Sequence, residues 1–566
     1  SSLAAATPNV VVILADDMGV GDVSHNGGKA STPHLDRLAK EGMRFTDAHS
    51  ASSVCTPTRY ALVTGRYNWR SPLKNGVLWG PSEALIRNGE TTIAAFLGKH
   101  GYQSSVIGKW HLGLGWAKLD EKAQAAEGPT RGVGWDIDFG KPVANGPTAL
   151  GFSEDFLFPA SLDMAPYVYL RDDEVIEQPT ISNALHPGRW GPAVKGMEAA
   201  QCLGDFAREA RAFIGRANEM EKPFFLYLPL TSPHTPIAPS EAFKGRSDLG
   251  PYGDFLMETD WVVGEVLAEL DDRQLAEDTL IVSTTDNGCS PAAGITKPEP
   301  KGHFPNSKLR RHNADIYEGG HRVPFLVRWP GKVAAGAVSD RTICQTDIFA
   351  TVAAALDQPL GETAAPDSVS FLPTLTGEAQ DPRPATVHHS INGSFAIRKG
   401  PWKLCLCPGS GGWSEPKPKQ AWNDKKLPRV QLFNLADDPG ETKNLESEHP
   451  DKVDELIGEL VALIERGRTS TGPSQPNNGE IPFHKELLTV GQATTSACPW
   501  SSASTDRGEP APAGRMVARF ASTTGTVVPL EGLDDLSQNI DPRSSKDTWS
   551  TTPRVREPDT TQSRTS

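Results

Sequence analysis

Cysteine is scarce in this chain, and long apolar runs are missing. The 566 residues include 7 cysteines, too few for a dense disulfide framework, and the odd count leaves at least one cysteine without a partner in the chain. No apolar run approaches the roughly 20 residues that a membrane-spanning helix needs. We therefore expect a globular protein with an ample buried core and no membrane span. We find no internal repeat.

Positive charge is in deficit. Lys and Arg number 56, Asp and Glu number 70, and the formal net charge is −14. This balance argues against wholesale binding to nucleic acid or anionic lipid, and an anionic substrate would need a local group of cations. The chain opens SSLAAATPNV without Met. This start fits either the mature end left by signal-peptide cleavage or a cloning boundary, and we expect an exported, periplasmic or extracellular protein.

Short apolar or β-branched runs alternate with longer helical stretches through the first two-thirds of the chain. This pattern predicts an α/β fold with a large, mostly parallel sheet. The strand candidates are residues 9–15, 102–108, 223–230, 278–285 and 323–329. Apolar residues at three- and four-residue spacing predict helices over residues 32–42, 91–101, 203–217, 254–272 and 346–356.

The pattern changes after about residue 380. Two short strand pairs and an amphipathic helix over residues 451–467 predict a small α+β unit on a short antiparallel sheet. Beyond about residue 481 the composition turns to Ser, Thr, Pro, Asp and Arg, with little to bury. We therefore expect an α/β domain over residues 1–380, a small α+β subdomain over 381–480 and a poorly ordered tail over 481–566.

Polar residues follow four of the predicted strands. Because ligands bind beyond the carboxyl ends of strands in open parallel sheets, these residues should meet at one rim. They are Asp16 and Asp17, Lys109 and His111, His234, and Asp286 and Asn287.

Neighbouring carboxylates repel each other unless a cation lies between them. The acidic residues and Asn287 offer only oxygen ligands, which favour a hard divalent ion such as Ca²⁺ or Mg²⁺. The ordinary alternative for both acidic segments is a solvated turn after a strand. Lys109, His111 and His234 have ordinary alternatives too, as surface or core residues.

The stretch SSVCTPTRYALVTGRY, residues 52–67, places a cysteine near the start of a predicted helix. Pro57 suits the first helical position, so Cys55 lies at or just before the helix N-terminus, which favours an anion. Arg59 follows one turn later and can face the same side as the sulfur. A nucleophile and a cation would then share one small space, unless Cys55 is a buried cysteine that packs as a small hydrophobe.

These motifs resemble those of the type I sulfatases, in the alkaline phosphatase superfamily. The pattern Cys-x-Pro-x-Arg at 55–59, with the Thr-Gly-Arg that follows, is the most specific. Similar blocks follow in the family's order: GKWHLG at 108–113, SPHTP at 232–236, TTDNG at 284–288, YEGGHRVPFLVRWPG at 317–331 and LFNLADDPGETKNL at 432–445. The resemblance covers roughly residues 8–475 and implies an alkaline phosphatase-like sheet sandwiched by helices.

The resemblance implies a sulfatase that hydrolyses the sulfate ester of a carbohydrate or aryl compound. A maturation enzyme would oxidise Cys55 to formylglycine. By the same resemblance, Ca²⁺, with Mg²⁺ as the alternative, would be held by the modified Cys55 with Asp16, Asp17, Asp286 and Asn287. Arg59 would hold the modified side chain, Lys109 and His234 would bind sulfate oxygens, His111 would assist collapse of the intermediate, and His234 or a neighbour would protonate the leaving alcohol.

One position departs from the family pattern. Five residues before the Glu of the Glu-Gly-Gly block the family usually has Lys, and this chain has Asn313. Asn donates hydrogen bonds without charge, so one cation facing the sulfate is missing, and we expect weakened or altered activity. The nearby cations that could replace it are Lys308, Arg310, Arg311 and His312. Two alternatives remain: a phosphoesterase or phosphonate hydrolase of the same superfamily, and a catalytically impaired protein that binds sulfated glycans.

Overall fold

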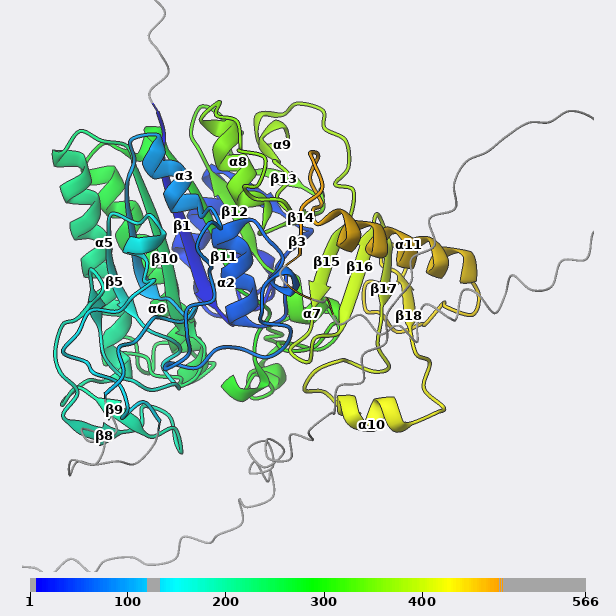
Figure 1. Cartoon of the computed structure of the whole chain (residues 1–566), viewed down its shortest axis with the longest axis horizontal. Helices are drawn as coiled ribbons and strands as arrows, with labels where there is room; N and C mark the ends of the chain where they lie inside the picture. Colours follow the sequence, from blue (N-terminus) through cyan, green and yellow to red (C-terminus); the bar gives the residue numbers. More distant parts are fainter. Residues whose placement is uncertain (1–6, 120–132, 478, 480, 482–566) are drawn as a thin grey trace, which may run out of the picture. The chain divides into compact units, whose positions relative to one another are not determined.

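A ten-stranded sheet forms the centre of the fold (Figure 1). The structure is a computed structural model, and it describes residues 7–119, 133–477, 479 and 481. Apart from Ile481, the predicted tail lies outside the described residues. Neighbouring strands follow the order β13 (Ala337–Ser339), β2 (Met43–Phe45), β12 (Phe325–Arg328), β11 (Thr279–Thr285), β1 (Asn9–Asp16), β10 (Phe224–Pro233), β4 (Gln103–Lys109), β5 (Glu154–Phe158), β6 (Leu170–Arg171) and β7 (Glu174–Val175).

The middle of this sheet is parallel, which confirms the predicted fold class. Strands β11, β1, β10, β4 and β5 run in one direction. The strand predicted over residues 323–329 forms as β12 but runs antiparallel to β11. Strand β6 is likewise antiparallel to β5. The parallel strands therefore lie between antiparallel neighbours, and their carboxyl ends meet at one edge.

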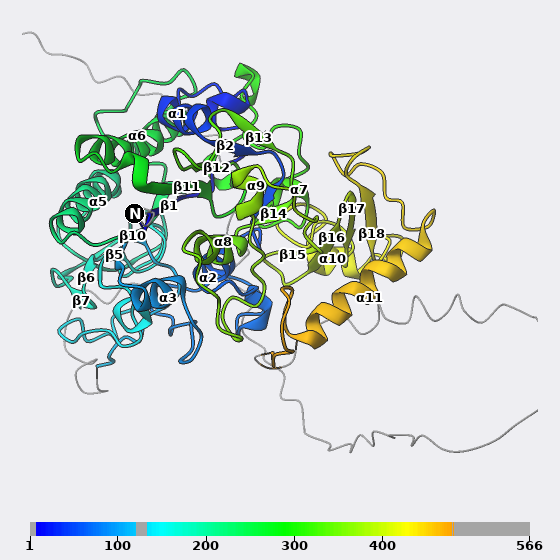
Figure 2. The ribbon, with the colours of Figure 1, turned by 90° about the horizontal axis from the view of Figure 1, so that it is seen from above.

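Helices cover both faces of the sheet (Figure 2). The alternation in β1 explains why: Val10 and Val12 belong to one buried cluster, and Val11 and Ile13 belong to another. The first cluster includes residues of α2 (Cys55–Thr64), α3 (Ile93–Lys99) and α8 (Asp347–Ala355). The second includes residues of α1 (Pro33–Glu41), α5 (Cys202–Glu219) and α6 (Pro251–Asp272).

The predicted small antiparallel sheet is also present. It consists of β15 (Thr386–His389), β16 (Phe395–Lys399), β17 (Trp402–Cys405) and β18 (Gln431–Asn434), with α11 (Pro450–Arg466) along it in Figure 1. Leu456 and Leu460 of α11 share a buried cluster with Ala51 and Ala61, which precede and lie within α2. Both sheets belong to the same compact unit.

Several shorter strands and α-helices lie among the described residues. They are β3 (Ala48–His49), β14 (Ile343–Cys344), β8 (Ile181–Asn183), β9 (Gly191–Ala193), α7 (Glu318–His321), α9 (Leu372–Thr376) and α10 (Pro418–Asn423). The six cysteines among the described residues are buried and free of disulfides. Within the same residues, no helix has the length and apolar character needed to cross a membrane.

Candidate metal centre and nucleophile

Three carboxylates gather where the central strands end. Because β1 and β11 pair in parallel with Ala15 opposite Thr285, Asp16 and Asp286 leave the sheet side by side. Ligand oxygens of Asp16, Asp17 and Asp286 lie within 4.8 Å of one another, and all three residues are buried. The Asp17 backbone N–H donates to Asp286 Oδ1 over 3.1 Å, and Asp17 adopts a φ of 63°, which turns the chain sharply at the strand end.

Two buried cations face these carboxylates. Lys109 Nζ, at the end of β4, donates to Asp16 Oδ2 over 2.6 Å. Arg59 of α2 donates to Asp286 Oδ2 from Nη2 at 2.8 Å and from Nε at 3.1 Å. Its Nη1 donates to the Lys109 carbonyl over 3.0 Å. Lys109 and Arg59 thus face three carboxylates, and His234 Nε2 lies 3.7 Å from Asp17 Oδ2.

The pKa values of the carboxyl groups reflect burial and the neighbouring charges. Burial disfavours the ionised form of Asp16, yet Lys109, His234 and Arg59 together hold its pKa well below the ordinary value. Burial and the neighbouring Asp16 charge raise the pKa of Asp286 to about 7. Burial also raises the pKa of Asp17. A divalent cation among these oxygens would favour the ionised forms of all three.

The oxygens present fit a hard divalent cation. Asp16 Oδ1 and Asn287 Oδ1 are buried and have no hydrogen-bond partner among the described residues. Asn287 donates its amide N–H to Asp17 Oδ1 over 2.5 Å, which leaves its oxygen available. A buried oxygen without a partner costs free energy, and a bound ion would remove that cost. Carboxylate and amide oxygens are the ligands that Ca²⁺ and Mg²⁺ prefer.

Cys55 is the first residue of α2 and is 7% exposed. Burial raises the pKa of its thiol to about 12, with Asp286 and Asp16 adding to the rise and Lys109 and Arg59 opposing it. The thiol therefore lies in the electrostatic field of the carboxylate group. With such a pKa it stays protonated near neutral pH, and a protonated thiol is a poor nucleophile.

His111 and His234 differ in charge. His111 Nε2 lies 2.7 Å from the Leu78 carbonyl, which can only accept, so Nε2 carries the proton. Its Nδ1 is buried without a hydrogen-bond partner in the described part of the chain, and burial, with the Lys109 charge, holds its pKa well below the ordinary value. Burial also disfavours protonation of His234, but Asp16 and Asp17 raise its pKa above the ordinary value.

Asn313 lies beside the carboxylates. Arg310 and Lys308, two of the cations that could have replaced the missing Lys, do not. Asn313 Nδ2 donates to Asp17 Oδ1 over 2.7 Å, and its Oδ1 is buried without a partner among the described residues. Arg310 instead stacks on Tyr317, with the guanidinium carbon 3.8 Å from the ring centroid. Its Nη1 donates to the Glu441 carbonyl over 2.5 Å. Lys308 is exposed at the surface.

The sequence analysis missed two residues beside His234. Ser161 Oγ lies 3.3 Å from His234 Nδ1, and the Asp163 charge contributes to raising the His234 pKa. Both follow β5, a strand that the sequence patterns did not single out. If residues 154–158 had been recognised as a strand, both residues would have been candidates, because ligands bind beyond the ends of parallel strands.

A cavity of about 340 Å³ is lined by residues that follow two of the site segments, and no carboxylate of the group lines it. Thr235 and Pro236, which follow His234, form part of its wall, and residues 292–294, which follow the Asp286 segment, form another. Ile237 and Tyr252 add apolar surface, and Lys297 adds a cation.

Known proteins are similar to this chain over most of its length. The family model described as Sulfatase matches residues 8–358. N-acetylgalactosamine-6-O-sulfatase of Bacteroides thetaiotaomicron is 34% identical over 504 residues, which cover 82% of this chain and 93% of the relative. Arylsulfatase A of Homo sapiens is 31% identical, with 87% and 95% covered.

A solved structure gives the same result. It comes from work on the metabolism of multiple glycosaminoglycans by Bacteroides thetaiotaomicron, and it is 32% identical to this chain. The superposition has a TM-score of 0.70 and covers 81% of this chain and 99% of the other.

Proposed function

The chain belongs to the sulfatase family, and from this premise we propose that it hydrolyses carbohydrate or aryl sulfate esters through a formylglycine at position 55 and a divalent cation. One observation carries the proposal: buried oxygens of Asp16 and Asn287 lack hydrogen-bond partners in the described structure, in the electrostatic surroundings of the residue that would be oxidised. We further propose that a formylglycine-generating enzyme modifies Cys55. We also propose that this protein is exported.

Asp16, Asp17, Asp286 and Asn287 would hold the cation, which we propose to be Ca²⁺, with Mg²⁺ as the alternative. A bound divalent cation polarises the sulfate ester and lowers the pKa of the attacking hydroxyl. Formylglycine, as its hydrate, would supply one hydroxyl that attacks sulfur and a second that expels sulfate as the aldehyde re-forms. The unmodified thiol, with its raised pKa, is unsuited to the attack.

The chain's own cations would bind the sulfate group. Arg59 is fixed by Asp286 and the Lys109 carbonyl and would hold the modified side chain. Lys109 and His234 would face the sulfate oxygens, where negative charge grows in the transition state. Because burial keeps these groups in place before substrate arrives, they need no reorganisation during the reaction.

The two histidines would move protons in opposite directions. His111 carries its proton on Nε2 and presents an unprotonated Nδ1, so it would accept a proton from the second hydroxyl when sulfate leaves. His234 donates from Nδ1 to the Thr235 carbonyl over 2.6 Å. The nearby carboxylates favour its charged form, so Nε2 would give a proton to the leaving alcohol.

Turnover of matched esters tests this proposal against a phosphoesterase. We expect the protein with converted Cys55 to hydrolyse 4-nitrophenyl sulfate with a kcat/KM at least about tenfold above that for 4-nitrophenyl phosphate. The two esters share one leaving group, so the ratio reports the choice of anion in the transition state. A higher kcat/KM for the phosphate or for a phosphonate ester would favour the alternative hydrolase.

The Asn313→Lys variant tests the missing cation. Asn313 already donates to Asp17 Oδ1, so an ammonium group there would retain that contact and add positive charge beside the sulfate. We expect kcat on 4-nitrophenyl sulfate to rise by about 10²-fold, the scale of one preorganised donor. Asn313→Gln is the matched control, since it changes length without charge.

An unchanged kcat in Asn313→Lys would contradict the assigned place of this residue. Tight binding of a sulfated glycan without sulfate release, in the wild-type protein with converted Cys55, would instead favour the impaired glycan-binding protein. Binding of sulfated glycans without hydrolysis is the second candidate function, because Asn313 occupies a position where the family usually has Lys.

A further inference from the structure

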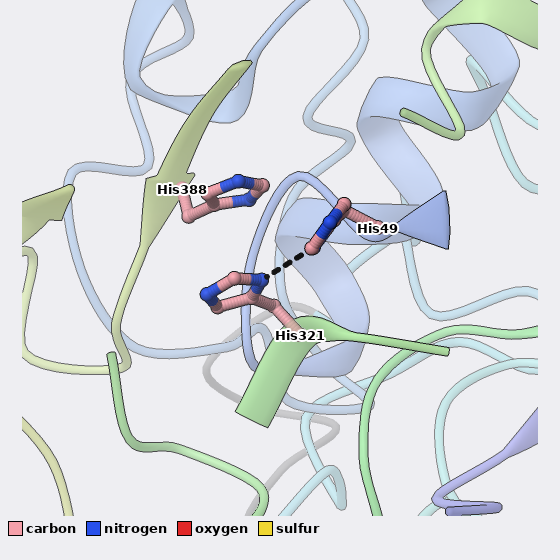
Figure 3. Close-up of side chains that lie close together, drawn as sticks. All are labelled: His49, His321 and His388. Carbon is pink, nitrogen blue, oxygen red and sulfur yellow. Dashed lines mark hydrogen bonds between the residues drawn. The ribbon is translucent and has the colours of Figure 1, made fainter. Parts of the chain in front are cut away.

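Three buried histidines meet where the two sheets join. Figure 3 shows His49 at the end of β3, His321 at the end of α7 and His388 on β15. Their ring nitrogens lie within 4.8 Å of one another, and each residue is at most 1% exposed. The proposed reaction uses none of them.

Charged residues set the protons of this cluster. Lys403 Nζ lies 2.9 Å from His321 Nε2 and can only donate, so the His321 proton is on Nδ1. That proton points to His49 Nδ1 over 3.1 Å, the dashed line in Figure 3. His49 Nε2 in turn lies 2.9 Å from Asp47 Oδ1 and 2.8 Å from Arg398 Nη1. Contacts within hydrogen-bond distance therefore run from Lys403 to Asp47 without a gap.

The geometry of the rings disfavours a shared metal ion. The His321 and His388 rings are stacked, with centroids 3.8 Å apart and planes 7° from parallel. Lone pairs of imidazole nitrogens lie in the ring plane, so two stacked rings cannot both point at one ion. The Lys403 ammonium also occupies the free nitrogen of His321. Burial holds the pKa of all three imidazoles below the ordinary value, and the cluster is a hydrogen-bonded network and not a set of metal ligands.

The network holds the loop that leads into Cys55, residues 50–54. His388 Nδ1 donates to the Ser50 carbonyl over 3.0 Å, and the Ser50 N–H donates to the His321 carbonyl over 2.8 Å. Next along the chain, the Ser53 N–H donates to the His389 carbonyl over 3.0 Å, and Ser52 Oγ donates to it over 2.8 Å. The loop is thus bonded to β15 on one side and to α7 on the other.

The same loop supports α2 and the Asn313 segment. The Ser52 carbonyl accepts from Thr58 Oγ1 over 2.9 Å, in the first turn of the helix that begins at Cys55. The Ser53 carbonyl accepts from the Ala314 N–H over 2.8 Å, next to Asn313. A displacement of the loop would therefore move residue 55 relative to the carboxylates.

We propose that His388 and His321 are positioning residues for Cys55, which they place by clamping residues 50–54 between the small sheet and α7. This inference rests on the proposed function, because it assigns the small sheet to the support of the reacting side chain. It makes β15 a part of the active-site scaffold, although none of its residues touches the carboxylate group.

Two variants of His388 test the clamp. His388→Leu removes the donor to Ser50, and His388→Asn keeps an N–H near the position of Nδ1. With rates expressed per converted Cys55, we expect His388→Leu to lower kcat on 4-nitrophenyl sulfate about 10²-fold with KM within about twofold, the cost of misplacing a reacting group. His388→Asn should recover kcat to within about tenfold of the wild type.

Leu456→Ala on α11 is the control for a loosened small sheet. Leu456 belongs to the buried cluster that also includes Ala51 of the loop, and it makes no hydrogen bond to the loop that the structure describes, so this variant weakens packing and leaves the hydrogen bonds in place. We expect it to lower the melting temperature while kcat stays within about twofold, because the loop's hydrogen bonds are kept. Wild-type kcat in His388→Leu, an equal loss in His388→Asn, or an equal loss in Leu456→Ala would each overturn the proposal.

Hydrogen exchange gives a readout that does not need turnover. The Ser50 and Ser53 amides should exchange at least about tenfold faster in His388→Leu than in the wild type. In Leu456→Ala the same two amides should exchange at the wild-type rate. If converted wild-type protein releases no sulfate from any ester, the proposed function fails, and exchange alone then decides the clamp. Unchanged exchange in His388→Leu would overturn the clamp whatever the activity.

Discussion

Replacement of Cys55 by alanine is expected to abolish sulfate release, with kcat falling by about 10⁴-fold or more, the scale on which enzymes lose activity without their nucleophile. Alanine cannot be converted to formylglycine, and the attacking oxygen would be absent. The carboxylates and cations around residue 55 would remain, since none of their hydrogen bonds uses the Cys55 side chain. The measurement is sulfate release from 4-nitrophenyl sulfate at saturating substrate.

Cys202→Ala is the matched control. Cys202 is also buried, at the start of α5, but it belongs to the core on the other face of the sheet. We expect this variant to retain kcat within about twofold, because deleting one small buried group affects stability and not the reacting side chain. Activity of Cys55→Ala above about one hundredth of the wild type would contradict the assigned nucleophile.

Replacement of Asp286 by alanine is expected to remove both the metal response and the activity. Asp286 accepts from Arg59 and from the Asp17 N–H, so its loss removes a proposed ligand and frees two groups that position others. We expect kcat to fall on the order of 10³-fold or more. At a Ca²⁺ concentration of 100 times Kd, the wild type should gain about 2.7 kcal/mol of unfolding free energy, and the variant should gain almost none.

Asp260→Asn on α6 is the control for Asp286→Ala. It shows the effect of losing a buried aspartate that is not a proposed metal ligand. Asp260 is also buried, and it accepts from the backbone N–H groups of His34 and Leu35. This variant should unfold at a lower temperature and still be stabilised by Ca²⁺. An Asp286→Ala protein that responds to Ca²⁺ as the wild type does would show that the carboxylate group is not the binding site.

The sheet was predictable because its signal is local. The buried strands are near-continuous apolar runs, and β1 packs helices on both faces through successive residues such as Val10 and Val11. The direction of β12 was not predictable in this way. A short apolar strand looks the same whether it pairs parallel or antiparallel, and only the path of the chain before it decides.

The meeting of the acidic residues was predictable for a related reason. Parallel strands end at one edge, so residues that directly follow β1 and β11 must lie close together. Side chains on long connections are different. Arg310 is three residues from Asn313, yet it stacks on Tyr317, because a loop can turn successive side chains in opposite directions.

The histidine cluster could not be predicted at all. His49, His321 and His388 come from β3, α7 and β15, and their meeting depends on how the small sheet docks against the loop before Cys55. No spacing in the sequence encodes that docking. The sequence patterns predict each sheet separately. The contacts between the two sheets are seen only in the folded structure.

The most direct test of the account is sulfate release measured against the converted fraction of residue 55. Peptide mass gives that fraction for preparations made with and without a formylglycine-generating enzyme, all supplied with Ca²⁺. The account predicts that the rate on 4-nitrophenyl sulfate rises in proportion to the converted fraction and extrapolates to zero for the unmodified thiol. A fully unconverted preparation that is as active as a converted one would contradict it, and so would a fully converted one that releases no sulfate.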